Sequence, residues 1–487
     1  MDANALAGWN GGTSMRRSIV ALLLGLIGVL SATAQADVGT VTLTETTITW
    51  QTVAHEIDAD GSIVRGSVNI NDVVEQTFTA YVLENDYIQV MLVPEYGGRI
   101  ISLIDKTTGN EQLYQNPLGL PYGIGDGNFY YDWLMVYGGI FPTFPAPEHG
   151  KSWFLPWSFE VITEETDEIT VRMGFVDDVT FQAAPGRFNP APTGLEAEYL
   201  VSLKAGHRAL DTTLTLSNPT DETVRYEYWT CVTLAPGSAT GDTQATLSTE
   251  IIAPIDQIKM PPWWPQTIAA ETATNMPDIY QFDALRIFDN WADMGIAYAY
   301  PTMNGANFWG AINQDNQEGL IRIADNTITP GLKIWTWGAE SADLPADIYA
   351  FNERRPYIEL WAGVTPEFFQ VAFLPAGESV TIIERYVVTT GLSNITHASD
   401  DVLVNVYQSD AGEIRLALAD TQPERPLTVV ITADETGLAD VELISGIDSE
   451  LTVPLPDGIT DVAFTVSAVD GEVLLAGALD VVAGTDG

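Results

Sequence analysis

The sequence predicts an all-β protein with a large β-sandwich followed by a smaller one. From Val41 onward, short runs rich in Val, Ile, Thr and Tyr are separated by Gly, Pro, Asn or Asp, which is the pattern of strands joined by turns. No long segment shows the apolar period of an amphipathic helix, and Thr274–Phe288 holds at most one or two short helices. A chain built almost wholly of short strands favours packed sheets.

The strand pattern is plainest near the start of the chain. Two apolar runs, Ile88–Val93 and Ile100–Ile104, flank a turn that contains Gly97-Gly98. Glycine tolerates positive φ and close backbone approach, so a tight connection between two strands is predicted. Further strands are predicted at Thr42–Thr52, Gln76–Leu83, Phe159–Ile162, Thr170–Phe175, Leu195–Leu203 and Ala209–Leu216.

A domain boundary is predicted near Gly391–Asp401, where the composition changes and tryptophan disappears. We therefore assign residues 37–395 to the large sandwich and residues 396–487 to an immunoglobulin-like sandwich, which would pack, space or attach the first. Seven short alternating segments predict its strands: Val402–Val406, Glu413–Leu418, Leu427–Thr432, Asp440–Ile444, Leu451–Leu455, Asp461–Ala468 and Val473–Val482.

Charge and cysteine content exclude several classes of partner. The 487 residues include 66 acidic and 20 basic side chains, a formal charge of −46, and such a field disfavours nucleic acid and anionic membrane surfaces. Cys231 is the only cysteine, so no intrachain disulfide can form, and with four histidines a cysteine-based zinc site is not expected. We predict neither a metal nor a cofactor, and the sequence leaves the oligomeric state open.

Residues 1–36 have the pattern of a secretory signal peptide. Arg16-Arg17 precede the apolar run Ile19–Leu30, and Ala34-Gln35-Ala36 follows as a small-residue cleavage site. The run is too short to span a bilayer comfortably, and no cysteine follows the site for lipid attachment. A secreted or periplasmic location is therefore expected.

His149 and Glu359 are the candidate catalytic residues. His149 lies in a loop stiffened by three prolines and surrounded by aromatic residues, where a histidine serves either as a general acid/base or as a structural residue bonded to backbone. Strand alternation places Glu359 on one face with Tyr357 and Trp361. A carboxylate between two aromatic rings suits contact with a sugar, although an edge-strand Glu facing water fits the same pattern.

Six further residues are candidates for substrate binding. Alternation also puts Lys333 and Trp337 on one strand face with Trp335, where the ammonium would stack on the rings or hold a substrate oxygen; a lysine stem lying over aromatic surface is the simpler alternative. Arg99 opens a strand beside the double-glycine turn. The remaining candidates are Asp132 in the Tyr130–Trp133 cluster, and Trp229 and Trp361 as stacking rings.

The chain resembles the galactose-mutarotase-like β-supersandwich proteins, and within them the bacterial family known as domain of unknown function 5107. The resemblance covers roughly Val41 to Leu392 and is carried by five segments in the same order: Tyr87–Tyr114, Gly138–His149, Asn218–Gly237, Pro330–Gly338 and Tyr357–Gly363. It implies a supersandwich fold with the catalytic Glu at Glu359 and a catalytic His at His149. The chain departs from the mutarotase pattern at two places: Trp361 stands where a Gln is expected, and the strand that holds Cys231 lacks a second His.

The predicted function is that of a secreted carbohydrate-active protein. An enzyme that moves protons on a sugar or polysaccharide, mutarotase- or epimerase-like, is the first hypothesis, with Glu359 as base, His149 as acid, Arg99 and Lys333 neutralising oxygens, and Trp229 and Trp337 stacking on the ring. A polysaccharide lyase or a glycoside hydrolase is the alternative within enzymes, and in a hydrolase Asp132 or Glu95 would be the second carboxylate. A non-catalytic carbohydrate-binding protein is the alternative outside them.

N-terminal sequencing of protein recovered from the medium or periplasm should begin at Asp37, because cleavage is expected after Ala36. An intact N-terminus embedded in the membrane fraction would contradict the secretory interpretation.

Overall fold

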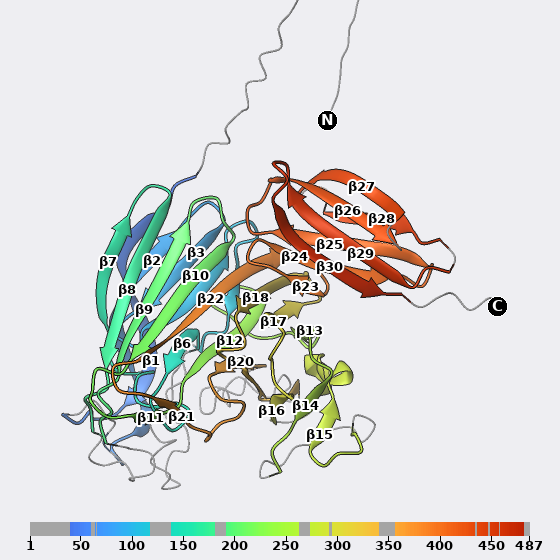
Figure 1. Cartoon of the computed structure of the whole chain (residues 1–487). Helices are drawn as coiled ribbons and strands as arrows, with labels where there is room; N and C mark the ends of the chain where they lie inside the picture. Colours follow the sequence, from blue (N-terminus) through green and yellow to red (C-terminus); the bar gives the residue numbers. More distant parts are fainter. Residues whose placement is uncertain are drawn as a thin grey trace, which may run out of the picture. The chain divides into compact units, whose positions relative to one another are not determined.

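Strands form nearly all the regular structure of this chain, which confirms the all-β prediction (Figure 1). The computed structural model describes residues 39–59, 64, 66–116, 138–180, 191–262, 273–291, 295–339, 356–433, 436–446, 449–456 and 458–481. The helices predicted in Thr274–Phe288 are reduced to two 3-10 turns, η2 (Asp283–Leu285) and η3 (Phe288–Asn290), after strand β15 (Ile279–Gln281). The predicted signal peptide lies outside the described residues.

The first large sheet contains strands from both the N-terminal and the later part of the main sandwich. Its twelve described strands lie in the order β1 (Thr42–Ala54), β2 (Asn69–Glu84), β3 (Ile88–Val93), β4 (Arg99–Asp105), β5 (Asn110–Leu113), β12 (Trp229–Ser238), β20 (Ile358–Gly363), β19 (Gly331–Thr336), β16 (Gly295–Tyr300), β14 (Gln257–Lys259) and β15, with β6 (Ile140–Thr143) beside β12 and β4. Strands distant in sequence, such as β5 and β12, are therefore neighbours at its centre.

The second large sheet has eight described strands and packs against the first. Their order is β13 (Thr249–Ile252), β17 (Phe308–Asn313), β18 (Glu318–Ala324), β22 (Ser379–Thr390), β10 (Ala209–Ser217), β9 (Glu196–Lys204), β8 (Glu168–Val176) and β7 (Ser158–Glu164). One apolar core joins the two sheets: Leu103 and Val232 of the first pack in the same cluster as Val201 and Leu214 of the second. This is the predicted sandwich. Strands β11 (Val224–Tyr226) and β21 (Ala372–Leu374) pair with each other in a separate two-stranded sheet.

A buried polar network crosses this core. Arg322 of β18 bonds the Glu384 carboxylate of β22 at 2.5 Å, and its other nitrogens bond Asn326 at 2.8 Å and Thr329 at 3.0 Å. Thr230 of β12, in the opposite sheet, donates to the second oxygen of Glu384 at 3.2 Å. Arg322 and Glu384 are almost fully buried, so each neutralises a charge that water cannot reach.

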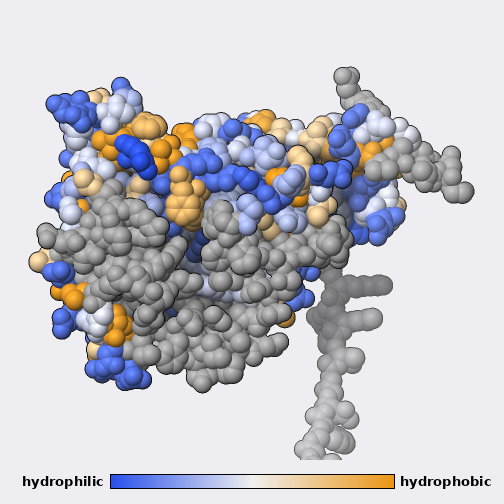
Figure 2. All heavy atoms as spheres, turned by 90° about the horizontal axis from the view of Figure 1, so that it is seen from below, coloured by the Kyte–Doolittle hydropathy of each residue, from blue (hydrophilic) through white to orange (hydrophobic). Residues whose placement is uncertain are grey.

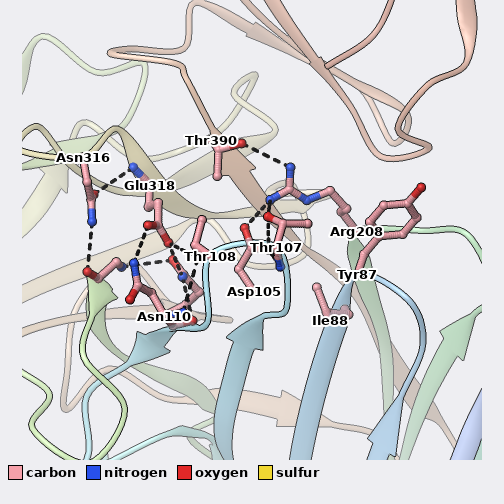
Figure 3. A network of polar contacts seen from close by, with 12 residues as sticks. Tyr87, Ile88, Asp105, Thr107, Thr108, Asn110, Arg208, Asn316, Glu318 and Thr390 are labelled. Carbon is pink, nitrogen blue, oxygen red and sulfur yellow. Dashed lines mark hydrogen bonds and ion pairs between the residues drawn. The ribbon is translucent and has the colours of Figure 1, made fainter. Parts of the chain in front are cut away.

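A second polar network ties the turns at one end of the sandwich (Figure 3). Arg208, before β10, forms an ion pair with the buried Asp105 at the end of β4 and bonds Thr390 of β22 at 3.2 Å. Beside it, the Glu318 carboxylate accepts hydrogen bonds from Asn110 at 2.6 Å and from Thr108 and Gln112. These bonds connect strand ends of the two sheets.

The strands after residue 396 form two more sheets. One contains β23 (His397–Ala398), β24 (Val402–Gln408), β25 (Glu413–Asp420) and β28 (Glu450–Pro454), and the other β27 (Thr436–Ile444), β26 (Pro426–Ala433), β29 (Asp461–Ala468) and β30 (Val473–Asp480). All seven predicted strands are present, and they enclose an apolar core of their own.

This C-terminal part also contacts the second large sheet. Leu392, Ile395 and Leu403 share an apolar cluster with Phe308 and Ile312. The backbone N–H of Arg208 donates to the carbonyl of Thr421 at 2.7 Å, and the Asn307 amide to that of Ala398 at 2.8 Å. The placement of a domain boundary at residue 395 stays a prediction.

The described surface is hydrophilic with scattered apolar residues. Figure 2 shows this mixture on the face seen there. No helix of the described residues is long and apolar enough to cross a membrane.

Substitution of Arg322 by Met should lower the free energy of unfolding by about 3–5 kcal/mol, because it leaves the Glu384 charge buried without its cation. Chemical denaturation measures the change. Arg172→Met is the matched control: Arg172 pairs with Glu160, but both side chains are about half exposed, so a loss of at most about 1 kcal/mol is expected. Equal losses in the two variants would contradict a special role for the buried pair.

Candidate functional site

A row of side chains crosses the centre of the first sheet. The register pairs Cys231 of β12 with Trp361 of β20, Trp361 with Lys333 of β19, and Lys333 with Tyr298 of β16. Directly paired residues in an antiparallel sheet point to the same face, so these four side chains lie side by side. Period-two alternation then puts Glu359 on the same face of β20 as Trp361.

Glu359 and Lys333 form a buried ion pair on this face. The Lys333 ammonium donates to Oε1 of Glu359, the Tyr357 hydroxyl donates to Oε2, and the Cys231 thiol lies 3.8 Å from that oxygen. Burial lowers the pKa of Lys333, and the Glu359 carboxylate opposes that effect. Burial also raises the pKa of the Cys231 thiol, which disfavours the reactive thiolate and leaves Cys231 as a packing residue.

Three aromatic rings surround the Lys333 ammonium. Its nitrogen lies 4.7 Å from the centre of the Trp361 ring, 5.1 Å from Trp335 and 5.1 Å from Phe368. Rings at these distances favour a cation. Lys333 is only 2% exposed, so its ammonium does not reach water. The alternative interpretation, in which the lysine stem lies over the aromatic rings and its charge stays in solvent, therefore does not apply.

His149 meets the same cluster from a different part of the chain. Its ring packs edge-on against Trp361, with the ring centres 5.0 Å apart. Its Nδ1 lies 3.3 Å from Oε1 of Glu148, and the loop is held because Thr143 donates to the carbonyl of Glu148 at 2.7 Å. The His149 side chain is 21% exposed and is therefore more accessible than Lys333.

The structure thus brings together three segments that are far apart in sequence. His149 and Lys333 contact the Trp361 ring, and Lys333 bonds Glu359. A buried carboxylate, a buried ammonium and a partly exposed imidazole provide a proton acceptor, a fixed positive charge and a second group that can exchange protons. No group of three or more potential metal ligands is found among the described side chains.

Two buried carboxyl groups beside the cluster were missed by the sequence interpretation. Glu148 is 3% exposed and Glu227, from the connection between β11 and β12, is 2% exposed. Burial, with a smaller contribution from the charge of Glu148, raises the pKa of Glu227 to about 8. Glu148 also acts electrostatically on Lys333 and Tyr298. Both lie in segments that carry the family resemblance, Gly138–His149 and Asn218–Gly237, but no local pattern relates the two side chains to each other.

Arg99 and Trp229 are placed differently from their predicted roles in substrate binding. The guanidinium of Arg99 is fully buried, donates to the carbonyls of Tyr96, Gly138 and Trp153, and lies 3.8 Å from the Phe141 ring centre. It therefore ties backbone segments together.

Trp229 is also fully buried. Its ring occupies the space that side chains at Gly331 and Gly363 would fill, and it packs on Phe368 with the ring centres 4.8 Å apart. In this position the ring packs the sheet and presents no surface to a sugar.

The remaining candidate residues differ in how deeply they are buried and in what they contact. Trp337 is partly buried, with its ring 5.4 Å from that of Trp335 and 6.4 Å from that of Tyr357. Trp361 is fully buried and is the ring shared by His149 and Lys333. Asp132 lies outside the described residues. Glu95 is exposed on the turn after β3, where it accepts hydrogen bonds from Thr79.

Comparison with known proteins confirms the resemblance predicted from the sequence. Residues 67–185 match the model of the family described as domain of unknown function DUF5107. Among solved structures, a TPR-domain containing protein from Parabacteroides distasonis ATCC 8503 is similar with a TM-score of 0.55 and 18% identity, over 74% of this chain and 58% of that one. The present chain therefore spans little more than half of that protein, and at this identity the likeness shows a shared fold alone.

Galactose mutarotase-like proteins are also among the similar structures. One from Clostridium acetobutylicum has a TM-score of 0.45 and 10% identity, over 72% of this chain and 99% of that one. One from Lactobacillus casei ATCC 334 has a TM-score of 0.41 and 11% identity, over 64% and 100%.

The raised pKa of Glu227 predicts a pH-dependent stability. The folded state holds a proton on Glu227 that the unfolded chain, with a pKa near 4.5, loses earlier. This contribution to stability is present below about pH 4.5 and is lost as the pH rises through about 8. Glu227→Gln keeps a neutral group, so the variant should gain on the wild type by on the order of a few kcal/mol between about pH 5 and pH 9.

Thermal unfolding of both proteins across this pH range measures the difference in their stability. Contributions from the other acidic residues are the same in both proteins and cancel in this difference. Glu367→Gln, at a partly exposed carboxylate paired with Lys259, is the control and should show no such gain. A constant difference between wild type and Glu227→Gln would contradict the assignment.

Proposed function

We propose that this protein is an enzyme that interconverts forms of a sugar by proton transfer, in the manner of a mutarotase or epimerase. The observation that carries the proposal is the convergence of Glu359, Lys333 and His149 around the Trp361 ring. A structural role for each residue separately would not require three distant segments to meet. Aromatic walls beside polar groups also suit a pyranose, which has apolar faces and a rim of hydroxyls.

Glu359 is assigned as the proton acceptor and His149 as the proton donor. In anomer exchange, the base removes the proton of the anomeric hydroxyl, the bond between the anomeric carbon and the ring oxygen breaks, and the acid protonates that oxygen; ring closure on the other face returns both protons. Lys333 and Tyr357 each donate a hydrogen bond to Glu359 and so orient its carboxylate for this step. Their bonds fix the carboxylate before the sugar arrives, which reduces the reorganisation that the reaction needs.

The geometry favours this reaction over the two alternatives within enzymes. A lyase would need Arg99 and Lys333 to bind a uronate, but Arg99 is engaged by backbone carbonyls and Lys333 by Glu359. A hydrolase would need a second carboxylate opposite Glu359. Of the two predicted candidates, Glu95 is bound to Thr79 on an exposed turn, which gives no support to that role, and Asp132 lies outside the described residues.

A non-catalytic binding protein would instead present an exposed strip of tryptophan rings. Of the described tryptophan candidates for such a strip, Trp229 and Trp361 are fully buried and Trp337 is partly buried. The partner proposed is therefore a carbohydrate bound in a catalytic site, and the proposed location, given the signal-like N-terminus, is outside the cytoplasm.

Glu359→Gln should lower turnover by on the order of 10²-fold or more with binding largely kept, because the amide preserves shape but accepts a proton poorly. Exchange between anomers, measured by NMR on a panel of aldoses, is the direct assay. Reducing ends and the absorbance of unsaturated uronates, measured on a polysaccharide panel, detect hydrolase and lyase activity.

Two further variants separate chemistry from folding. Glu359→Gln leaves the buried Lys333 ammonium without its carboxylate, so Glu359→Gln combined with Lys333→Met should recover stability but not turnover. Glu95→Gln, at an exposed carboxylate away from the cluster, should retain full activity. Normal anomer exchange in Glu359→Gln would reject the assignment, and product formation only on the polysaccharide panel would favour the alternatives.

A further inference from the structure

Glu148 and Glu227 are two buried carboxyl groups that the proposed reaction does not use. They come from different connections: Glu148 ends the proline-rich loop after β6, and Glu227 lies between β11 and β12, with its backbone N–H bonded to the carbonyl of Pro145 in that same loop. Among the described residues, neither carboxyl forms an ion pair with a lysine or arginine. Buried carboxyls without such a partner are costly to keep, which points to a role for the pair.

Each carboxyl has one oxygen that is clearly engaged. Oε1 of Glu148 faces Nδ1 of His149 at 3.3 Å, and Oε2 of Glu227 accepts the backbone N–H of Phe369 at 3.1 Å. Oε2 of Glu148 is buried with no hydrogen-bond donor among the described residues. Phe369 follows Phe368, whose ring packs against those of His149 and Trp361. The two carboxyls therefore hold the two segments that flank the imidazole.

We propose that Glu148 is the positioning residue of His149 and that Glu227 carries a proton for this buried pair, so that the charge beside the imidazole changes when Glu227 ionises. The inference deepens the proposed function and rests on it for its catalytic meaning. The contacts themselves do not depend on the identity of the substrate.

A carboxylate at Nδ1 fixes which ring nitrogen carries the proton. The neutral ring then holds its proton on Nδ1, so Nε2 takes up a second proton to form the imidazolium, and it is this Nε2 proton that His149 donates to a ligand. If the Glu148 carboxylate is removed, this contact no longer favours one tautomer or one ring orientation of His149 over the other. Glu148 thus acts through His149 and does not itself need to touch a sugar.

Glu227 controls the charge next to this contact. Burial raises the pKa of Glu227 to about 8, and the charge of the Glu148 carboxylate adds to this because two ionised carboxylates repel each other. The other ionisable groups that interact with these two carboxyls are Arg225, whose positive charge lowers the pKa of Glu227, Lys333, which is neutralised by Glu359, and Tyr298, whose pKa burial raises. The ionisation of Glu227 is therefore the charge change expected beside the loop near pH 8.

The test uses the full chain labelled with ¹⁵N-histidine. Only four histidines are present, and His149→Gln assigns the signal of interest. In the wild type, the neutral His149 ring should carry its proton on Nδ1. Its ¹⁵N chemical shifts should also change with a midpoint near pH 8, where Glu227 ionises. Glu148→Gln should abolish the tautomer preference, and Glu227→Gln should abolish the movement near pH 8 while keeping the tautomer.

Glu367→Gln is the matched control, since it removes a carboxylate beside Phe368 that bonds Lys259 and should change neither property. A proton on Nε2 in the wild type, or an unchanged tautomer in Glu148→Gln, would overturn the positioning role. A midpoint near pH 8 that survives Glu227→Gln would overturn the role of Glu227. Circular dichroism of each variant checks that it is folded.

Activity then separates this inference from the proposed function. Where an aldose is turned over, Glu148→Gln should lower kcat by roughly tenfold or more with KM little changed, and Glu227→Gln should shift the pH profile near pH 8. If no sugar is turned over but the tautomer results hold, the proposed function fails and the positioning of His149 stands. If turnover is normal in Glu148→Gln, the catalytic meaning of the positioning contact is rejected.

Discussion

The central strands of the first sheet are buried on both faces, and the polar chemistry of the protein follows from that constraint. β12, β19 and β20 consist almost wholly of buried residues. One face packs on the second sheet, where Thr230 reaches Glu384, and the other holds Cys231, next along β12, beside Glu359. A charge placed on either face is removed from water and requires a partner.

Several of the few basic residues of this acidic chain are buried and pair with groups of the protein. Arg322 neutralises Glu384 in the core, Lys333 neutralises Glu359, and Lys151 pairs with Asp177 where both side chains are fully buried. Arg99 is surrounded by carbonyl oxygens and an aromatic ring. These four cations are therefore committed to groups of the protein itself, which supports a neutral aldose over a uronate as the substrate of the proposed reaction.

The site combines a rigid part with a more exposed one. Glu359 and Lys333 lie on neighbouring strands and are fixed by register, whereas His149 lies on a loop whose position depends on the Thr143 bond and on the packing against Trp361. Glu227 connects that loop to the segment of Phe368 and Phe369, because its backbone N–H donates to the carbonyl of Pro145 and its carboxyl accepts the backbone N–H of Phe369.

The sequence by itself determined the strands and the faces of their side chains. Period-two alternation located β3 and the seven C-terminal strands, and it placed Glu359 with Trp361 and Lys333 with Trp335, because these relations depend only on residues within one strand. The tertiary structure alone decided that Lys333 pairs with Glu359, that Arg99 and Trp229 are buried, and that Glu148 approaches Glu227. Those contacts join strands and loops that are distant in the chain, and register and packing set which residues meet there; no local pattern records that choice.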